Sequence, residues 1–248
     1  MAALRSQQAG DVLWITMSRP EQRNAFDAAL IQELTEAFSA VGDDVRAVVL
    51  AGEGASFSAG ADVEWMRAAV ELSYEENVAD ARRLRKMLES IDSCPAPVIA
   101  RVQGHALGGG CGLVACSDIV VAHPDTHFAF AEVKLGIIPA VISPFAIAKI
   151  GPSAARRYFM TGERFGTATA LRIGLVHEVS GDLDEVVARL LGELRTAGPE
   201  AARHAKKLVL ERPDGLGTER RIAQRRTSDE GQEGLRAFIE KRKPSWYL

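Results

Sequence analysis

The sequence lacks the features of two large classes of protein, those that span membranes and those that bind nucleic acid. No segment approaches the about 18 consecutive apolar residues that a membrane-spanning helix requires. Residues 1–11 contain no apolar stretch of the kind found in secretory signals. The net charge of -3 leaves no basic footprint for nucleic acid. We therefore expect neither a membrane nor nucleic acid among the partners.

Cysteine and histidine are also sparse. The three cysteines, Cys94, Cys111 and Cys116, lie in apolar or glycine-rich segments, and their odd number does not suit a disulfide framework. We expect them to be reduced and structural, as in a cytoplasmic protein. The five histidines show no spacing typical of metal ligands. The sequence therefore predicts no metal site.

An ordinary globular composition is present, with 47% hydrophobic and 25% charged residues over 248 positions. Strand-like and helix-like segments alternate as far as Gly181, and the remainder is helical. We expect an α/β core domain over residues 1–181 and a helical C-terminal region over 182–248. The expected strands are 12–17, 45–51, 98–102, 118–122, 127–130 and 175–179. The expected helices are 28–40, a short one from 63, 74–91, 108–116, 142–150, 153–160, 167–173, 183–196, 199–211 and 218–241, the last with a break near Gly231–Gly234.

Two glycine-rich runs carry the first indication of chemistry. Phe57–Asp62 reads Phe-Ser-Ala-Gly-Ala-Asp, and Ala106–Gly112 reads Ala-Leu-Gly-Gly-Gly-Cys-Gly. Each follows a strand-like segment and opens into a helix, so each can aim backbone amides at a negatively charged oxygen. Two such donors aimed at one point form an oxyanion hole, which suits a thioester that becomes an enolate. Either run alone indicates only a turn, whereas the pair indicates a function.

Further motifs accompany these runs along nearly the whole chain. They are Arg19-Pro20, Asn24-Ala25-Phe26, Pro97-Val98-Ile99-Ala100, Ser117-Asp118-Ile119, Glu132-Val133-Lys134-Leu135-Gly136, Thr161-Gly162-Glu163-Arg164-Phe165 and the closing stretch Glu230–Arg242. With them the chain resembles the crotonase family, the enoyl-CoA hydratases and isomerases. The resemblance implies a spiral of β-β-α turns with a helical C-terminal trimerisation region. It also implies a homotrimer or a dimer of trimers, and a coenzyme A thioester as substrate with no separate cofactor.

The same resemblance implies roles for individual residues. The amides of Ala61 and Gly109 would form the oxyanion hole, beside Gly108 and Gly112 of the second run. Lys241, at the basic end of the chain, would approach the nucleotide of a neighbouring subunit, unless it is only a solvated helix end. The residues expected to line the coenzyme A site are Arg23, Asn24, Ala25, Ala59, Gly60, Asp62 and Val63.

One catalytic carboxylate of the family is present and one is missing. Family hydratases carry two glutamates, and the matching positions here hold Gly112 and Glu132. Glu132 is the expected acid–base group, in an apolar setting that raises its pKa. An exposed acid at a strand end is the alternative. Gly112 is expected to leave open space beside the acyl group. We expect a helix cap, a structural acid and a packed core histidine, respectively, at Asp62, Asp118 and His105.

A second departure from the family pattern concerns the acyl group. Pro139–Phe145 replaces the usual glycine-rich stretch, and with the closing motif it resembles a bacterial branch of 3-methylglutaconyl-CoA and isohexenylglutaconyl-CoA hydratases. A substrate carboxylate could replace the missing acid, or Ser143 could hold the water. The leading hypothesis is hydration of a branched or carboxylated enoyl-CoA. A Δ3-Δ2-enoyl-CoA isomerase, for which one carboxylate suffices, and a non-catalytic acyl-CoA-binding protein are the alternatives.

Overall fold

Six strands form the main sheet in the computed structural model, which describes residues 3–247. The first strand pairs with the second in antiparallel fashion, and all other neighbours are parallel. The parallel strands are short and almost wholly apolar, which is typical of a sheet that is covered on both faces. In spatial order the strands are β1 (Leu4–Ala9), β2 (Val12–Met17), β3 (Ala47–Gly52), β4 (Val98–Val102), β6 (Ile119–Ala122) and β9 (Glu178–Val179).

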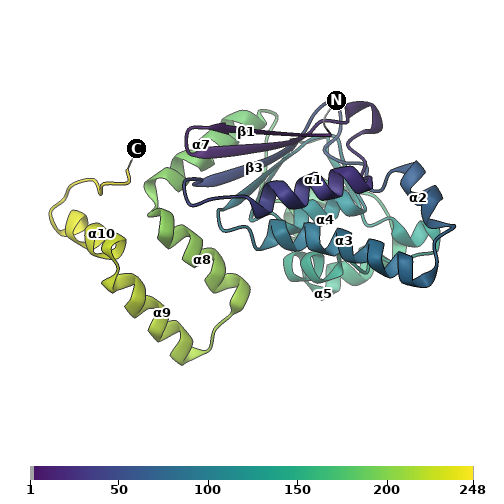
Figure 1. Cartoon of the computed structure of the whole chain (residues 1–248). Helices are drawn as coiled ribbons and strands as arrows, with labels where there is room; N and C mark the ends of the chain where they lie inside the picture. The colour runs from purple at the N-terminus through teal and green to yellow at the C-terminus, as the bar shows by residue number, and fades with distance from the viewer. Residues whose placement is uncertain (1–2, 248) are drawn as a thin grey trace.

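Helices cover both faces of this sheet (Figure 1). The larger core lies on one face and is formed with α1 (Ala28–Ser39), α3 (Tyr74–Asp92), α4 (Gly109–Cys116) and α5 (Ser143–Thr161). The other face is covered by α7 (Leu183–Thr196), whose buried residues pack on β2, β3, β4 and β6. Shorter elements connect them: η1 (Pro20–Gln22), α2 (Val63–Ala69), η2 (Glu132–Leu135) and α6 (Thr167–Arg172).

A second, three-stranded sheet is formed by short strands in the segments that connect the larger elements. It consists of β5 (His105–Leu107), β7 (His127–Ala129) and β8 (Phe165–Gly166). The first two strands run parallel, and an isolated parallel bridge between Ser58 and Ala106 adds a further segment beside β5. Because parallel strands end at the same edge, the residues that follow these three segments are brought together.

The last three helices form an arm that extends away from the sheet (Figure 1). They are α8 (Pro199–Glu211), α9 (Gly215–Thr227) and α10 (Asp229–Ile239). The arm is tied to the core by Arg203, whose buried guanidinium donates to the side chain of Asp43 (2.6 Å) and to the carbonyl of Val45 (2.9 Å). The mixed α/β class and the helical C-terminal region are therefore confirmed. The domain boundary at 181/182 stays a prediction, and α7, which follows it, packs on the sheet.

Several expected elements differ from the structure. The edge strand β1 was not predicted, because its sequence is polar and its side chains are mostly exposed. One kinked helix, α5, replaces the two expected between 142 and 160, since Gly151 has a φ of 73° within it. The break in the last helix lies at Ser228, whose hydroxyl caps α10, and not at Gly231–Gly234. The late strand covers only Glu178–Val179.

Candidate active site

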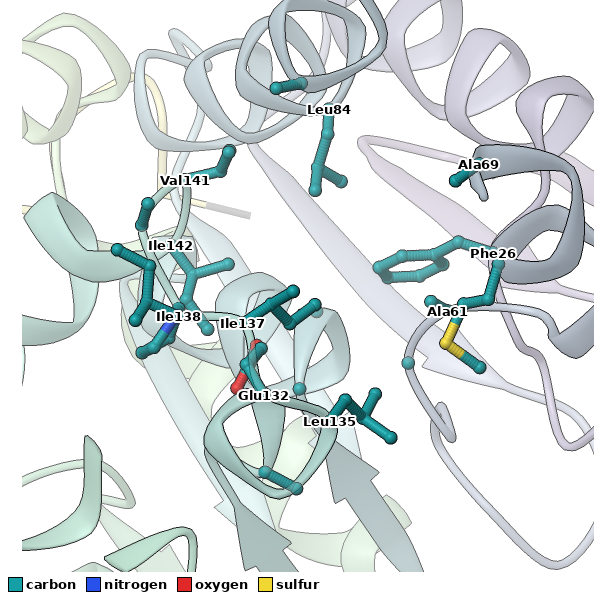
Figure 2. A pocket seen from close by; sticks show the side chains of 18 of the residues that line it. Phe26, Ala61, Ala69, Leu84, Glu132, Leu135, Ile137, Ile138, Val141 and Ile142 are labelled. Atoms are coloured by element: carbon teal, nitrogen blue, oxygen red, sulfur yellow. The ribbon is translucent and has the colours of Figure 1, made fainter. Parts of the chain in front are cut away.

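A cavity of about 450 Å³ lies between α2, α3 and the segment that leads into α5. Its walls are mainly apolar, and Figure 2 shows Phe26, Leu84, Ile137 and Ile142 facing a common space, with the carboxylate of Glu132 among them. A concave, largely apolar pocket with few polar groups is the usual form of a small-molecule site.

Three parallel segments reach this cavity from the second sheet. The amide of Ser58 donates to the carbonyl of His105 (2.9 Å), and the amide of Leu107 donates back to that of Ser58 (3.0 Å). On the other side of β5, the amide of Gly108 donates to the carbonyl of Ala129 (2.8 Å). This pairing delivers to one edge the segments Ala59–Ala61, Gly108–Gly109 and Ala131–Glu132.

The two glycine-rich runs are in direct contact. A Cβ on Gly60 would lie 2.6 Å from the carbonyl oxygen of Leu107 and 3.6 Å from the amide nitrogen of Gly109. Gly60 therefore has no room for a side chain. Its φ of 88° also lies in the region that favours glycine. Gly109 is the first residue of α4, so its amide has no acceptor in a preceding turn. The amide of Ala61 donates no hydrogen bond within the described residues.

Glu132 lies beside this contact. Its Oε1 is 3.4 Å from the position that a Cβ on Gly108 would take. Its Oε2 is buried and accepts no hydrogen bond within residues 3–247. Burial raises the pKa of the Glu132 carboxyl, while a bond to its own backbone opposes the rise. The expected apolar setting is confirmed, and the alternative of an exposed strand-end acid is wrong.

Gly112 does not leave open space, so that expectation is wrong. A Cβ there would lie 2.7 Å from Cγ2 of Ile142 and 3.4 Å from Cδ2 of Leu88. Ile142 lines the cavity, but Gly112 lies behind it and is not among the lining residues. The position that holds a glutamate in family hydratases is therefore filled by two neighbouring side chains.

The segment expected at the coenzyme A site lies alongside the first glycine-rich run. The carbonyl of Arg23 accepts from the amide of Ala59 (2.9 Å), and the amide of Phe26 donates to the carbonyl of Gly60 (2.7 Å). Asn24 is fully buried, and its side chain donates to the carbonyls of Glu53 and Ser56, so it positions the loop. Of the expected coenzyme A residues, the cavity is lined by Ala59 and Gly60 but not by Arg23, Asn24, Ala25, Asp62 or Val63.

The expected structural roles of two acids are confirmed. Asp62 caps α2 by accepting from the amide of Glu64, and it forms an ion pair with Arg19. Asp118 accepts from the amide of Val98 (2.7 Å) and pairs with Lys206 (2.7 Å).

His105 is half-buried and lies outside the cavity lining. Its ring stacks on that of His127, and its Nδ1 lies 3.3 Å from the hydroxyl of Ser56. It is therefore packed among neighbouring side chains, as expected, although it is not fully enclosed.

Two further predicted site residues lie outside the cavity lining. Ser143 begins α5, and its hydroxyl donates to the carbonyl of Ala140 (2.8 Å). Lys241 follows α10, in the arm that extends away from the core (Figure 1). Its expected role concerns a second subunit and stays a prediction.

Sequence reasoning missed the wall of the cavity that α3 supplies. Asn77, Asp80, Ala81 and Leu84 line it, with a spacing of three and four that places them on one helical face. The spacing is visible in the sequence, but Asn77 and Asp80 are polar, and polar residues on a helix usually face solvent. The wall from α2, with Trp65 and Met66, was missed as well.

Residues 3–247 contain neither a cluster of metal ligands nor a helix that could span a membrane. No group of three or more histidine, cysteine or acidic side chains there could hold a metal ion. No helix in that part of the chain has the length and apolar character needed to cross a membrane.

Comparison with known proteins places the chain among relatives over nearly its full length. A protein of Rhizobium meliloti named "Probable enoyl-CoA hydratase" is 35% identical, with 94% of this chain and 93% of that protein covered. The crystal structure of an enoyl-CoA hydratase from Shewanella pealeana is 39% identical with a TM-score of 0.93, and the match covers 98% of this chain and 96% of that one. Pseudomonas aeruginosa AtuE is 36% identical with a TM-score of 0.96, and the match covers 99% and 100% of the two chains.

These structural matches confirm that the spiral fold expected from the resemblance is present. The sequence profile described as "Enoyl-CoA hydratase/isomerase" matches residues 7–247. The match includes both glycine-rich runs and Glu132, the residues that the structure brings together at the cavity. The chain therefore belongs to the enoyl-CoA hydratase/isomerase family.

Proposed function

We propose that this protein adds water across the double bond of a 2-enoyl-CoA thioester. Glu132 acts as the acid–base group, and the amides of Ala61 and Gly109 form an oxyanion hole for the thioester oxygen. The observation that carries the proposal is a buried carboxylate oxygen, Oε2 of Glu132, without a hydrogen-bond partner, beside two glycine-rich runs in a mainly apolar cavity. Relatives named enoyl-CoA hydratase support it.

One carboxylate can complete the cycle. Ionised Glu132 takes a proton from water while the oxygen attacks the β-carbon and the electron pair moves to the thioester oxygen. The two amides stabilise that enolate oxygen. Protonated Glu132 then returns its proton to the α-carbon, which restores the thioester and the carboxylate. Burial favours this role because it brings the pKa of Glu132 nearer to neutral pH.

A branched acyl group fits the proposal. The residues that close the cavity opposite α2 and α3 are apolar, among them Ile137, Ile138 and Val141. The Pro139–Phe145 segment contributes part of this wall, and its resemblance to a branch that acts on methyl-branched substrates supports the branch rather than a carboxylate. The loop around Arg23 and Ala59 would hold the coenzyme A nucleotide, with Lys241 of a neighbouring subunit.

A Δ3-Δ2-enoyl-CoA isomerase is the second candidate, and the packing at Gly112 favours it. Ile142 and Leu88 fill the space where a second glutamate would stand. Moving a proton from C2 to C4 requires one carboxylate and no activated water, so Glu132 alone would suffice.

Absorbance of the conjugated enoyl thioester distinguishes the candidates. Purified protein is mixed with a 2-enoyl-CoA and, separately, with the matching 3-enoyl-CoA. We expect loss of the band from the 2-enoyl substrate, whereas gain of the band from the 3-enoyl substrate would establish the isomerase. Binding without change in either would leave a non-catalytic acyl-CoA-binding protein. Glu132→Gln, tested in parallel, shows whether the signal depends on this site.

A further inference from the structure

Helix α3 presents polar atoms to a cavity whose other walls are mainly apolar. Asn77 and Asp80 lie one helical turn apart, and both belong to the cavity lining together with Leu84. The side chain of Asp80 is only 13% exposed. Burying a carboxylate in a substrate pocket costs free energy unless a partner compensates it. Arg83 supplies that partner for one oxygen of Asp80, and the second oxygen remains an acceptor for a ligand in the cavity.

Both residues leave an acceptor oxygen without a partner. Arg83 donates to Oδ1 of Asp80 (2.6 Å), and Oδ2 accepts no hydrogen bond within residues 3–247. The Oδ2 atom of Asp80 remains accessible to solvent and therefore to a ligand in the cavity. The Nδ2 of Asn77 donates to the carbonyls of Leu72 and Ser73, which fixes the amide and leaves its Oδ1 as an acceptor.

The charges around the cavity disfavour a carboxylate on the acyl group. Lys134 is the one cationic side chain in the cavity lining of the described chain. Its stem lies against Gly162, with Cε 3.3 Å from the position of a Cβ there. The pKa of the Glu163 carboxyl is lowered chiefly by Arg157 and also by Lys134. The Lys134 ammonium therefore lies near the Glu163 carboxylate. Asp80 would repel a second carboxylate.

We propose that the α3 wall is a specificity subsite for a hydroxyl group on the acyl chain, which donates its one proton to Oδ2 of Asp80, beside Asn77. A neutral donor is favoured over an ammonium because Arg83 already balances the charge of Asp80. The side chain of Arg83 is 56% exposed and outside the cavity lining, so it holds Asp80 from the solvent side. The subsite rests on the proposed function, since it assumes that an acyl-CoA occupies the cavity.

Binding of saturated thioesters tests the subsite without any turnover. Calorimetry compares hexanoyl-, octanoyl- and decanoyl-CoA with the same thioesters carrying a terminal hydroxyl or a terminal carboxylate. A hydrogen bond to a charged group corresponds to roughly 10- to 100-fold in affinity. At one chain length we expect the hydroxyl thioester to bind about that much more tightly than its plain counterpart. The carboxylate thioester should bind most weakly.

Asp80→Leu keeps a side chain of similar bulk and removes the acceptor. The hydroxyl preference should fall to unity or below, while plain acyl-CoA binds at least as tightly as before. Arg83→Ala is the matched control, because it removes the ion pair but keeps the acceptor, and it should retain the preference. Circular dichroism checks that both variants fold.

Equal affinity for plain and hydroxylated thioesters at every length would overturn the subsite, as would a preference that survives in Asp80→Leu. The enoyl absorbance assay separates this outcome from failure of the proposed function. Absent hydration with an intact hydroxyl preference would remove only the hydratase. Intact hydration with no preference would remove only the subsite.

Discussion

The core and the C-terminal arm bury their helices to very different degrees. In α4, seven residues from Gly110 to Cys116 are buried, whereas α9 buries none and α10 buries only Ala237. Yet the arm is not polar, since Phe238 is 83% exposed and Ile239 is 76% exposed. Apolar area left in water forfeits roughly 25 cal/mol per Å². The core thus buries its apolar side chains within this chain, whereas the arm leaves apolar side chains exposed.

Two glutamates show the same contrast at the level of single side chains. Glu230 in the arm accepts from the amides of Glu200 and Ala201 (both 2.8 Å) and pairs with Arg225 (3.0 Å). Glu132 in the core leaves a buried oxygen without a partner. A fully bonded carboxylate stabilises the structure around it, whereas an unpartnered one costs stability and remains available for chemistry.

Substituting each glutamate by glutamine separates these roles, and Glu132→Gln should give the largest effect on turnover of all the variants. Glu132→Gln keeps the shape and removes the proton acceptor, so turnover should fall by roughly 10²–10⁴-fold. Glu230→Gln should leave turnover per folded site unchanged, because it lies in the arm. Steady-state kinetics on a 2-enoyl-CoA measures both. Full turnover in Glu132→Gln would remove this residue from the mechanism.

Phe238→Asp tests the exposed surface of the arm. We expect the protein to be a homotrimer or a dimer of trimers, with the arm at the interface. A charge in place of the exposed ring of Phe238 should then shift the mass measured by light scattering to that of a monomer at micromolar concentration. Arg226→Asp in α9 is a control for added negative charge on the arm. A monomeric wild-type protein at this concentration would show that the surface serves another purpose.

Arg203→Leu should loosen the arm from the core. Its guanidinium satisfies the carbonyls of Gly42, Asp43 and Val45, and these would lose a charged donor. A buried group left unsatisfied costs about 1–3 kcal/mol in stability, so for the three carbonyls we expect a loss of at least about 3 kcal/mol. Urea denaturation measures it, and limited proteolysis should show cleavage between α7 and α8. Unchanged protection there would mean that other contacts hold the arm.

Gly112→Ala tests the packing inside the core. A methyl group there would overlap Cγ2 of Ile142, and overpacking typically costs about 1–3 kcal/mol. Ile142→Leu keeps the volume but moves the branch from Cβ to Cγ, which removes Cγ2, so the double variant should recover part of the loss. Thermal denaturation of the four proteins gives the coupling. Additive losses would show that the two residues do not compete for space.

The sequence predicted the side of the cavity that carries the glycine-rich runs and Glu132 better than the side that α3 supplies. The glycine-rich runs and Glu132 form local patterns, because turns and helix starts need particular residues at fixed spacing. Asn77 and Asp80 lie on an amphipathic helix, where a polar residue is expected to face solvent. Only the tertiary structure shows that they line a cavity, so the sequence pattern could not predict this wall.

Gly112 shows a second limit. The missing glutamate was evident from the sequence, but the conclusion that its space stays open was wrong, because Ile142 is thirty positions away and fills it. Strand β1 was missed for a related reason: its side chains are mostly exposed, and its pairing with β2 comes from a tight turn at Gly10, which has a φ of 64°. Long-range packing and edge pairing leave weak local signals.

The pH dependence of stability at Glu132 should give the smallest effect. Burial raises the pKa of Glu132 in the folded state above its unfolded value, so the stability that this carboxyl contributes is full below the unfolded value and falls as the pH rises through the folded one. Above that window, Glu132→Gln should be more stable than the wild type by about 1 kcal/mol. This corresponds to roughly 2–4 °C in Tm for a chain of this size. Near pH 4 the difference should vanish, because the wild-type carboxyl is then protonated.

Glu230→Gln should be less stable than the wild type at neutral pH, since it breaks bonds to a carboxylate. Thermal denaturation of the three proteins between pH 4 and pH 8 measures both differences. If Glu132→Gln is less stable at every pH, the Glu132 carboxylate has a partner in solution, and the contrast between core and arm does not extend to this residue.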